Sequence, residues 1–398
     1  MEKGLNGRTN SLQLAKLYAN DPVLRLFKDG LHLTPVWFGV IGLLFWASTS
    51  YGLAMLMGYA RTSADFIGAF DERGIVISIS YIFFIYPIIW AFYLWQPTLI
   101  SHTLESLRRN GVIGPASSEP GKPVSDRKSF DYPDFVNELV KAFNNGWWPT
   151  LAAFFVVGLG LVFAVSIWPT YQPAVMGKPL WWYSNKPYLF LVRLPLLLLT
   201  WYMFVMFLIR EILAIVWFNR LFASFEAQVR PLHADNCGGL GAIGDFSIWS
   251  TVLAIAISVN LIIETLTPTF YGKPPNLSFE IMSGYGLYIL LVPSLLLAPI
   301  WAAHQAMKRA RDAELFTIAE EFEATLVAAQ AGLQRDSKTI EEDNDKMDQL
   351  QARYDMILKT FPVWPFSTSA LRNFSITASI PPLLGTASFV IEFFRNLF

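Results

Sequence analysis

The chain has 398 residues, of which 54% are hydrophobic and only 15% are charged. Its 30 Lys and Arg nearly cancel its 31 Asp and Glu, and the net charge of −1 excludes a nucleic-acid-binding protein that works through overall positive charge. The single cysteine, Cys237, excludes an intrachain disulfide framework. A soluble protein carries about 25% charged residues, so this composition predicts an all-α polytopic integral membrane protein.

Residues 1–32 are mixed and charged, and we expect them to lie in the cytoplasm or at the membrane interface. Asp21 and Pro22 have the pattern of a helix N-cap followed by a first-turn proline. About 20 apolar residues are needed to cross a bilayer. Six stretches meet this length, at residues 35–60, 75–100, 147–168, 187–209, 246–270 and 281–303.

These six spans predict a transmembrane domain over residues 33–303, with a flexible cytoplasmic linker and a short helix in residues 101–146. The C-terminal segment, residues 366–398, contains a weaker seventh stretch at 374–394. Pro381, Pro382 and Glu392 interrupt this stretch, which fits either a kinked span or a re-entrant segment.

The distribution of basic residues predicts the orientation of the chain. With a cytoplasmic N-terminus, 23 of the 30 Lys and Arg fall on the cytoplasmic side, as the positive-inside rule requires. We therefore expect a multi-pass protein of the cell membrane, of the bacterial cytoplasmic type, with most of its soluble residues in the cytoplasm.

The longest polar stretch follows the sixth span, and we expect residues 304–365 to form a cytoplasmic helical hairpin. Apolar residues alternate at spacings of four and three, which is the pattern of a coiled coil. The chain must return to the membrane for its last apolar segment, so a bend is expected within 332–338. Residues 304–361 are candidates for contact with another copy in a homo-oligomer or with a cytoplasmic protein partner, and no nucleic-acid partner is expected.

The sharpest local motif lies between the fourth and fifth spans. His233, Asp235 and Cys237 alternate, so in an extended segment their side chains point to one side and have the chemistry of zinc ligands. The motif predicts a divalent-metal site at the cytoplasmic face, although no cofactor is firmly indicated. The alternative is a tight turn, in which Asp235 and the following glycines lead into the fifth span.

Ionisable and polar residues inside the spans are the better functional indicators, because they are costly in a membrane. Arg193 and Glu264 lie at similar depths and are predicted to form a buried ion pair. In the fifth span, four hydroxyl residues recur at near-helical spacing and are candidates to line a pore. These are Ser247, Thr251, Ser258 and Thr265.

Three functions are compatible with these features. The polar face and the hairpin favour an oligomeric ion channel with a cytoplasmic assembly or gating element. The alternatives are a secondary transporter, or a membrane-anchored signalling or interaction protein. The pattern does not indicate an enzyme, although a hydrolase that uses His233 and Asp235 at the membrane face is left open.

Overall fold

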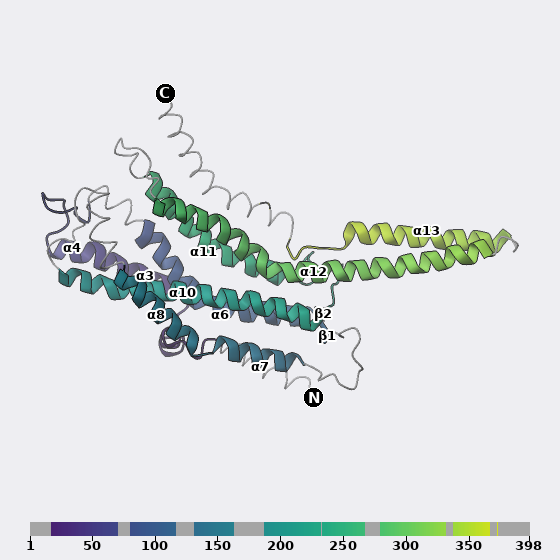
Figure 1. Cartoon of the computed structure of the whole chain (residues 1–398), viewed down its shortest axis with the longest axis horizontal. Coiled ribbons are helices and arrows are strands. Elements are labelled where there is room, and N and C mark those ends of the chain that lie inside the picture. Colours follow the sequence, from purple (N-terminus) through teal and green to yellow (C-terminus); the bar gives the residue numbers. More distant parts are fainter. Residues whose placement is uncertain are drawn as a thin grey trace, which may run out of the picture.

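The computed structural model describes residues 17–70, 80–116, 131–162, 187–231, 233–266, 279–331, 337–366 and 372. The described part is mainly helical. The long helices run along one axis, and a two-helix arm extends beyond the other helices (Figure 1). In chain order the elements are α2 (Pro22–Leu24), η1 (Arg25–Gly30), α3 (Pro35–Ala47), η2 (Ser48–Gly52), α4 (Leu53–Leu56), η3 (Ser80–Ile85), α6 (Tyr86–Arg109), β1 (Ile113–Ala116), α7 (Tyr132–Phe143), α8 (Trp147–Val162), α10 (Pro187–Ser224), β2 (Phe225–Ala227), α11 (Gly241–Leu266), α12 (Phe279–Ala331) and α13 (Ser337–Thr360).

Five helical stretches of the described chain are long and apolar enough to cross a membrane, so this is a multi-pass membrane protein of the all-helical class. They are Pro35–Leu56, Tyr81–Arg109, Val192–Ser224, Gly241–Ile263 and Met282–Gln330. They match five of the six stronger predicted spans. The other, at 147–168, corresponds to α8, of which 16 residues are described. The predicted segment 374–394 lies outside the described residues.

Two helices extend further than the sequence pattern predicts. The fourth predicted span ends at residue 209, but α10 continues through Arg210 and Glu211 to Ser224 because apolar residues resume directly after this charged pair. The sixth predicted span and the first helix of the hairpin are one uninterrupted helix, α12, with 53 residues. At 1.5 Å per residue α12 is about 80 Å long.

Residues 101–146 form less of a linker than expected. α6 continues to Arg109, and β1 follows it and pairs antiparallel with β2, with Ile113 opposite Ala227. The short helix predicted before Trp147 is present as α7. Its buried face, which includes Phe135 and Leu139, joins the hydrophobic core rather than a flexible connection. Residues 117–130 lie outside the described part.

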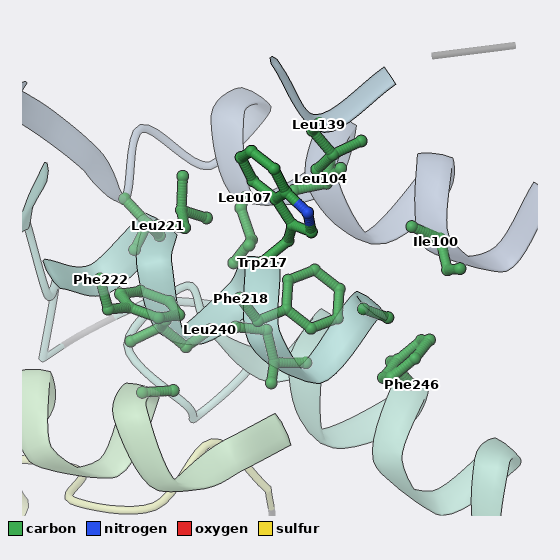
Figure 2. Close-up of a cluster of buried hydrophobic side chains, with 14 of the residues drawn as sticks. Ile100, Leu104, Leu107, Leu139, Trp217, Phe218, Leu221, Phe222, Leu240 and Phe246 are labelled. Carbon is green, nitrogen blue, oxygen red and sulfur yellow. The ribbon is translucent and has the colours of Figure 1, made fainter. Parts of the chain in front are cut away.

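One hydrophobic core lies where α6, α7, α10, α11 and α12 meet, next to the short sheet. Figure 2 shows Leu104 and Leu107 of α6, Leu139 of α7, and Trp217 and Phe218 of α10 pointing toward one another. The Trp217 and Phe135 rings pack edge to face with their centroids 5.3 Å apart. A second core connects α3, α6, α8 and α10 further along the bundle.

The arm consists of the distal half of α12 and the antiparallel helix α13 (Figure 1). Glu314 and Arg353 face each other across it, with 3.9 Å between Oε2 and Nη2. On α12 the less exposed residues are Leu315, Ile318, Phe322, Thr325 and Ala329. Ala319 and Leu326, which continue the apolar spacing of four and three from Leu315 and Phe322 in the sequence, are exposed. The neighbouring residues Ile318 and Thr325 lie in the seam in their place.

Candidate functional site: a buried polar cluster between α6 and α10

The most heavily bonded polar group in the described chain is the carboxylate of Asp21. Its Oδ1 accepts from the backbone N–H groups of Val23 and Leu24, at 3.1 and 3.3 Å. This confirms the predicted N-cap, and Pro22 occupies the first position of the short helix. A capping aspartate normally faces water, but Asp21 is only 3% exposed.

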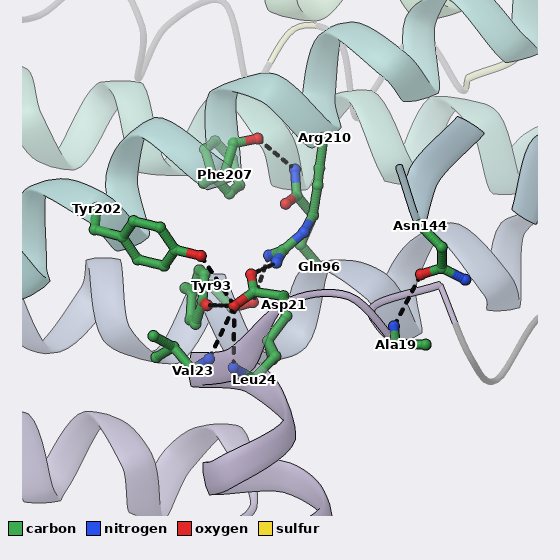
Figure 3. A network of polar contacts seen from close by, with 10 residues as sticks. All are labelled: Ala19, Asp21, Val23, Leu24, Tyr93, Gln96, Asn144, Tyr202, Phe207 and Arg210. Atoms are coloured by element: carbon green, nitrogen blue, oxygen red, sulfur yellow. Dashed lines mark hydrogen bonds and ion pairs between the residues drawn. The ribbon is translucent and has the colours of Figure 1, made fainter. Parts of the chain in front are cut away.

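Distant side chains complete the shell around Asp21 (Figure 3). Tyr93 of α6 and Tyr202 of α10 donate their hydroxyls to Oδ1 at 2.7 and 3.2 Å. Arg210 of α10 forms an ion pair with Oδ2, and its guanidinium lies 4.8 Å from the centroid of the Tyr93 ring. Arg210 is also 3% exposed. The N-terminal segment is therefore held between α6 and α10 by a fully buried ion pair.

A second pair of polar side chains lies one residue further along α10. Gln96 of α6 donates from Nε2 to Oε2 of Glu211 and to the backbone carbonyl of Phe207, both at 3.0 Å. Glu211 has no exposed surface, and Gln96 is 2% exposed. Along α10, Glu211 lies about 29 Å from Val192, the first residue of the candidate span. A hydrocarbon layer about 30 Å thick that begins at Val192 would therefore end near this cluster.

Arg193, at the opposite end of α10, lies among the helices near the start of the chain. Its Nη2 donates to Oγ of Ser50 at 2.8 Å, and its guanidinium is 5.8 Å from the centroid of the Trp46 ring. The side chain of Glu264 lies outside the described residues. The predicted Arg193–Glu264 ion pair therefore stays a prediction.

The four predicted pore-lining residues are buried within the single chain. Ser247, Thr251, Ser258 and Thr265 are each at most 1% exposed, and each hydroxyl donates to a carbonyl of its own helix. Thr265 also lies 3.2 Å from the hydroxyl of Tyr285 on α12. Their contacts are those of packed helices, and their role as pore-lining residues stays a prediction.

The loop with His233, Asp235 and Cys237 folds as a turn that starts α11. Oδ1 of Asp235 accepts from the backbone N–H groups of Cys237 and Gly239, and Oδ2 accepts from that of Gly241, at 2.9 to 3.0 Å. Gly238 has a φ of +65°, and a Cβ at this position would lie 2.4 Å from Cγ1 of Val229. Glycine is therefore required for both the conformation and the close approach.

The same turn brings two of the three predicted metal ligands, His233 and Asp235, into contact. Nδ1 of His233 lies 2.8 Å from Oδ1 of Asp235, whereas Cys237 is buried, and burial raises the pKa of its thiol to about 11. Within the described ranges, no group of three or more His, Cys, Asp or Glu side chains is arranged to hold a metal ion. Both carboxylate oxygens of Asp235 already accept backbone hydrogen bonds within the turn. The divalent-metal site stays a prediction.

Sequence reasoning identified Asp21 as a cap but missed Arg210, Glu211 and Gln96. An adjacent Arg–Glu pair with apolar residues on both sides was the available signal, since it is costly in a membrane-spanning helix unless partners are near. Comparison with known proteins adds no further assignment: no protein family matches this chain, and no curated protein or solved structure is significantly similar to it.

Proposed function

We propose that this chain is a membrane-anchored interaction protein whose helical arm binds a partner protein with a basic surface. The carrying observation is that α12 is continuous from a candidate membrane span into an exposed, strongly acidic arm (Figure 1). A partner bound to the arm is thereby connected to the membrane-spanning helices by a single element.

The charge of the distal arm supports a basic partner. Residues 312–348 contain eleven Asp and Glu against three Lys and Arg, a net charge of −8 in a chain whose total is −1. Among the described residues of 312–348, seven exposed carboxylates have no ion-pair partner: Glu320, Glu321, Glu323, Glu341, Glu342, Asp345 and Asp348. Such a concentration of negative charge attracts a positively charged surface and increases the rate at which it associates.

The same arm also exposes apolar side chains. Phe316 and Val327 of α12 are 68% and 63% exposed, and Met356 of α13 is 57% exposed. Apolar anchors surrounded by charged residues have the composition of a protein–protein contact surface. This supports a protein as the partner rather than a simple counter-ion.

A photo-crosslinking amino acid at Val327, in the full chain in its native membrane, tests the proposal. We expect a covalent adduct with a basic protein, and we expect the triple variant E320Q/E321Q/E323Q to lose it. A matched variant, D29N/D65N/E226Q, neutralises three exposed carboxylates outside the arm and should retain the adduct. No adduct at Val327, an adduct insensitive to the arm substitutions, or an adduct with a second copy of this chain would contradict the proposal.

An oligomeric ion channel is the second candidate, supported by the ionisable and hydroxyl residues that lie inside candidate spans. A pore along the α11 hydroxyls would require α11 to separate from α12, since Thr265 and Tyr285 are in contact. Ion flux through purified protein in liposomes tests this function. A channel predicts flux that changes in S258L and E264Q, and the absence of flux under all ionic conditions contradicts it.

A further inference from the structure

Two buried acceptor oxygens in the polar cluster have no hydrogen-bond donor among the residues that the structure describes. They are Oε1 of Gln96 and Oε1 of Glu211, on two side chains that are already joined by one hydrogen bond. Buried polar atoms in proteins nearly always have a partner. Two unpartnered atoms on adjacent groups therefore require a common explanation.

Rotation of the Gln96 amide does not provide this explanation. In the present orientation Nε2 donates to both the Phe207 carbonyl and Oε2 of Glu211. Exchanging the amide oxygen and nitrogen would place an acceptor against these two acceptors and lose both bonds. The orientation of the amide is fixed, and Oε1 of Gln96 must be satisfied from elsewhere.

The charge around Glu211 is also incomplete. Arg210, the neighbouring cation, is directed at Asp21, and these two charges cancel. The other titratable or polar groups in this region are Tyr93 and Tyr202, which both donate to Asp21, and Ser250 of α11, which faces the Glu211 carboxyl. Among the described residues no cation forms an ion pair with Glu211, so an ionised carboxylate would be buried without a counter-charge, at high energetic cost.

We propose that Glu211 and Gln96 form a proton-binding site, in which the protonated carboxyl of Glu211 donates from Oε1 to Oε1 of Gln96. One proton taken up from solvent by the carboxylate removes the uncompensated negative charge. The same proton satisfies both unpartnered oxygens, and the amide bond from Nε2 of Gln96 to Oε2 of Glu211 is kept. The two side chains then form a cyclic pair with one hydrogen bond in each direction.

Infrared spectroscopy of the purified full chain in lipid tests this site directly, because a protonated carboxyl has a C=O stretching band that an ionised one lacks. We expect this band at neutral pH, shifted by exchange into deuterated water, and absent in E211Q. The variant should fold, since a glutamine at this position can make the same two hydrogen bonds with Gln96. The matched variant E226Q removes an exposed carboxyl and should leave the band unchanged.

A second variant keeps the test decisive if E211Q fails to fold. In Q96L the Glu211 carboxyl loses its amide partner, so its C=O band should shift to higher frequency. The absence of a protonated-carboxyl band in the wild type overturns the proposal. So does thermal stabilisation by Na⁺ or K⁺ over choline that E211Q loses, since a metal cation would then occupy the site.

Discussion

At the scale of single residues, a buried ion pair connects two segments that are far apart in the sequence. Asp21 and Arg210 are 189 positions apart, yet each is almost fully buried against the other. Such a pair contributes little net stability compared with apolar residues, but removal of one partner leaves an unpaired charge in a low-dielectric environment. The contact between the N-terminal segment and α10, here called the Asp21–Arg210 lock, therefore depends on both residues being present.

Replacement of Asp21 by Ala should destabilise the protein by about 3–5 kcal/mol, because Arg210 is left buried without a counter-charge. Thermal unfolding in detergent micelles measures this change. The control D29A removes an exposed carboxylate that accepts only a hydroxyl of Tyr18 among the described contacts, and should change stability by less than about 0.5 kcal/mol. The double variant D21A/R210M should recover part of the loss; equal stability of D21A and D29A would contradict the lock.

Asp235 predicts a dependence of stability on pH. Burial raises the pKa of its carboxyl, but the backbone N–H groups of Cys237, Gly239 and Gly241 lower it more, so the pKa lies below its usual value. A depressed folded-state pKa contributes stability that is present above the unfolded value, about 3.9, and is lost as the pH falls through the folded value. D235A should lose about 1 kcal/mol at neutral pH and show a smaller loss on acidification. Unfolding curves from pH 7 to pH 2 test this, and an unchanged acid slope would contradict it.

At the scale of elements, close packing between helices depends on small residues at a few positions. α3 approaches α6 at Gly39 and Gly42, where a Cβ at Gly42 would lie 2.7 Å from the indole ring of Trp90. Small residues of this kind let membrane helices approach closely. The indole is itself held by a hydrogen bond from its Nε1 to Thr200 of α10, at 3.0 Å, so it cannot readily move away.

We therefore expect G42A to destabilise the α3–α6 contact by about 1–3 kcal/mol, the cost of overpacking a tight interface. G52A is the matched control, because a Cβ at Gly52 would have no atom of the described residues within 4 Å, and it should be neutral or slightly stabilising. Thermal unfolding of the two variants under the same conditions compares them. A similar effect of both substitutions would show that helix propensity, rather than packing against Trp90, determines the change in stability.

The elements were more predictable from sequence than their contacts. Apolar length located five spans, and the pattern from Pro231 to Gly241 allowed the turn that Asp235 forms. Helix ends were less predictable, since α10 continues across Arg210 and Glu211, whose partners Asp21 and Gln96 lie in other segments of the chain. A single sequence does not reveal which side chains more than 100 positions apart are in contact, so the buried polar cluster could be identified only from the structure.

At the scale of the whole molecule, the arm is peripheral to the bundle. Its helices contact each other along their seam, and the returning chain is fixed at the base, where His304 of α12 donates to the Val363 carbonyl at 2.6 Å and stacks on Trp364. The main hydrophobic core contains no residue of α13 among its described members. The bundle and the distal arm therefore have separate sources of stability.

Removal of residues 316–351, with a short glycine-rich linker in their place, should leave the bundle folded. Glu314 and Arg353 are adjacent in the arm, so the two cut ends lie close together. We expect the shortened chain to elute as a single species in size-exclusion chromatography and to keep its unfolding midpoint within about 2 °C of the full chain, a difference on the order of 1–2 kcal/mol. Aggregation of the shortened chain would show that the arm stabilises the bundle.

The unbroken course of α12 also has a mechanical consequence. From Ala303 to Ala331 the helix extends about 42 Å, and Pro293 and Pro299, at which helices kink, lie just before this section. If this section rotates by 5° about these prolines, its end at Ala331, the tip of the helix, moves by about 4 Å, because displacement is the product of the angle and the length. A force applied at the tip also acts on the membrane-spanning part of α12. A movement at either end of this helix can therefore be transmitted to the other end.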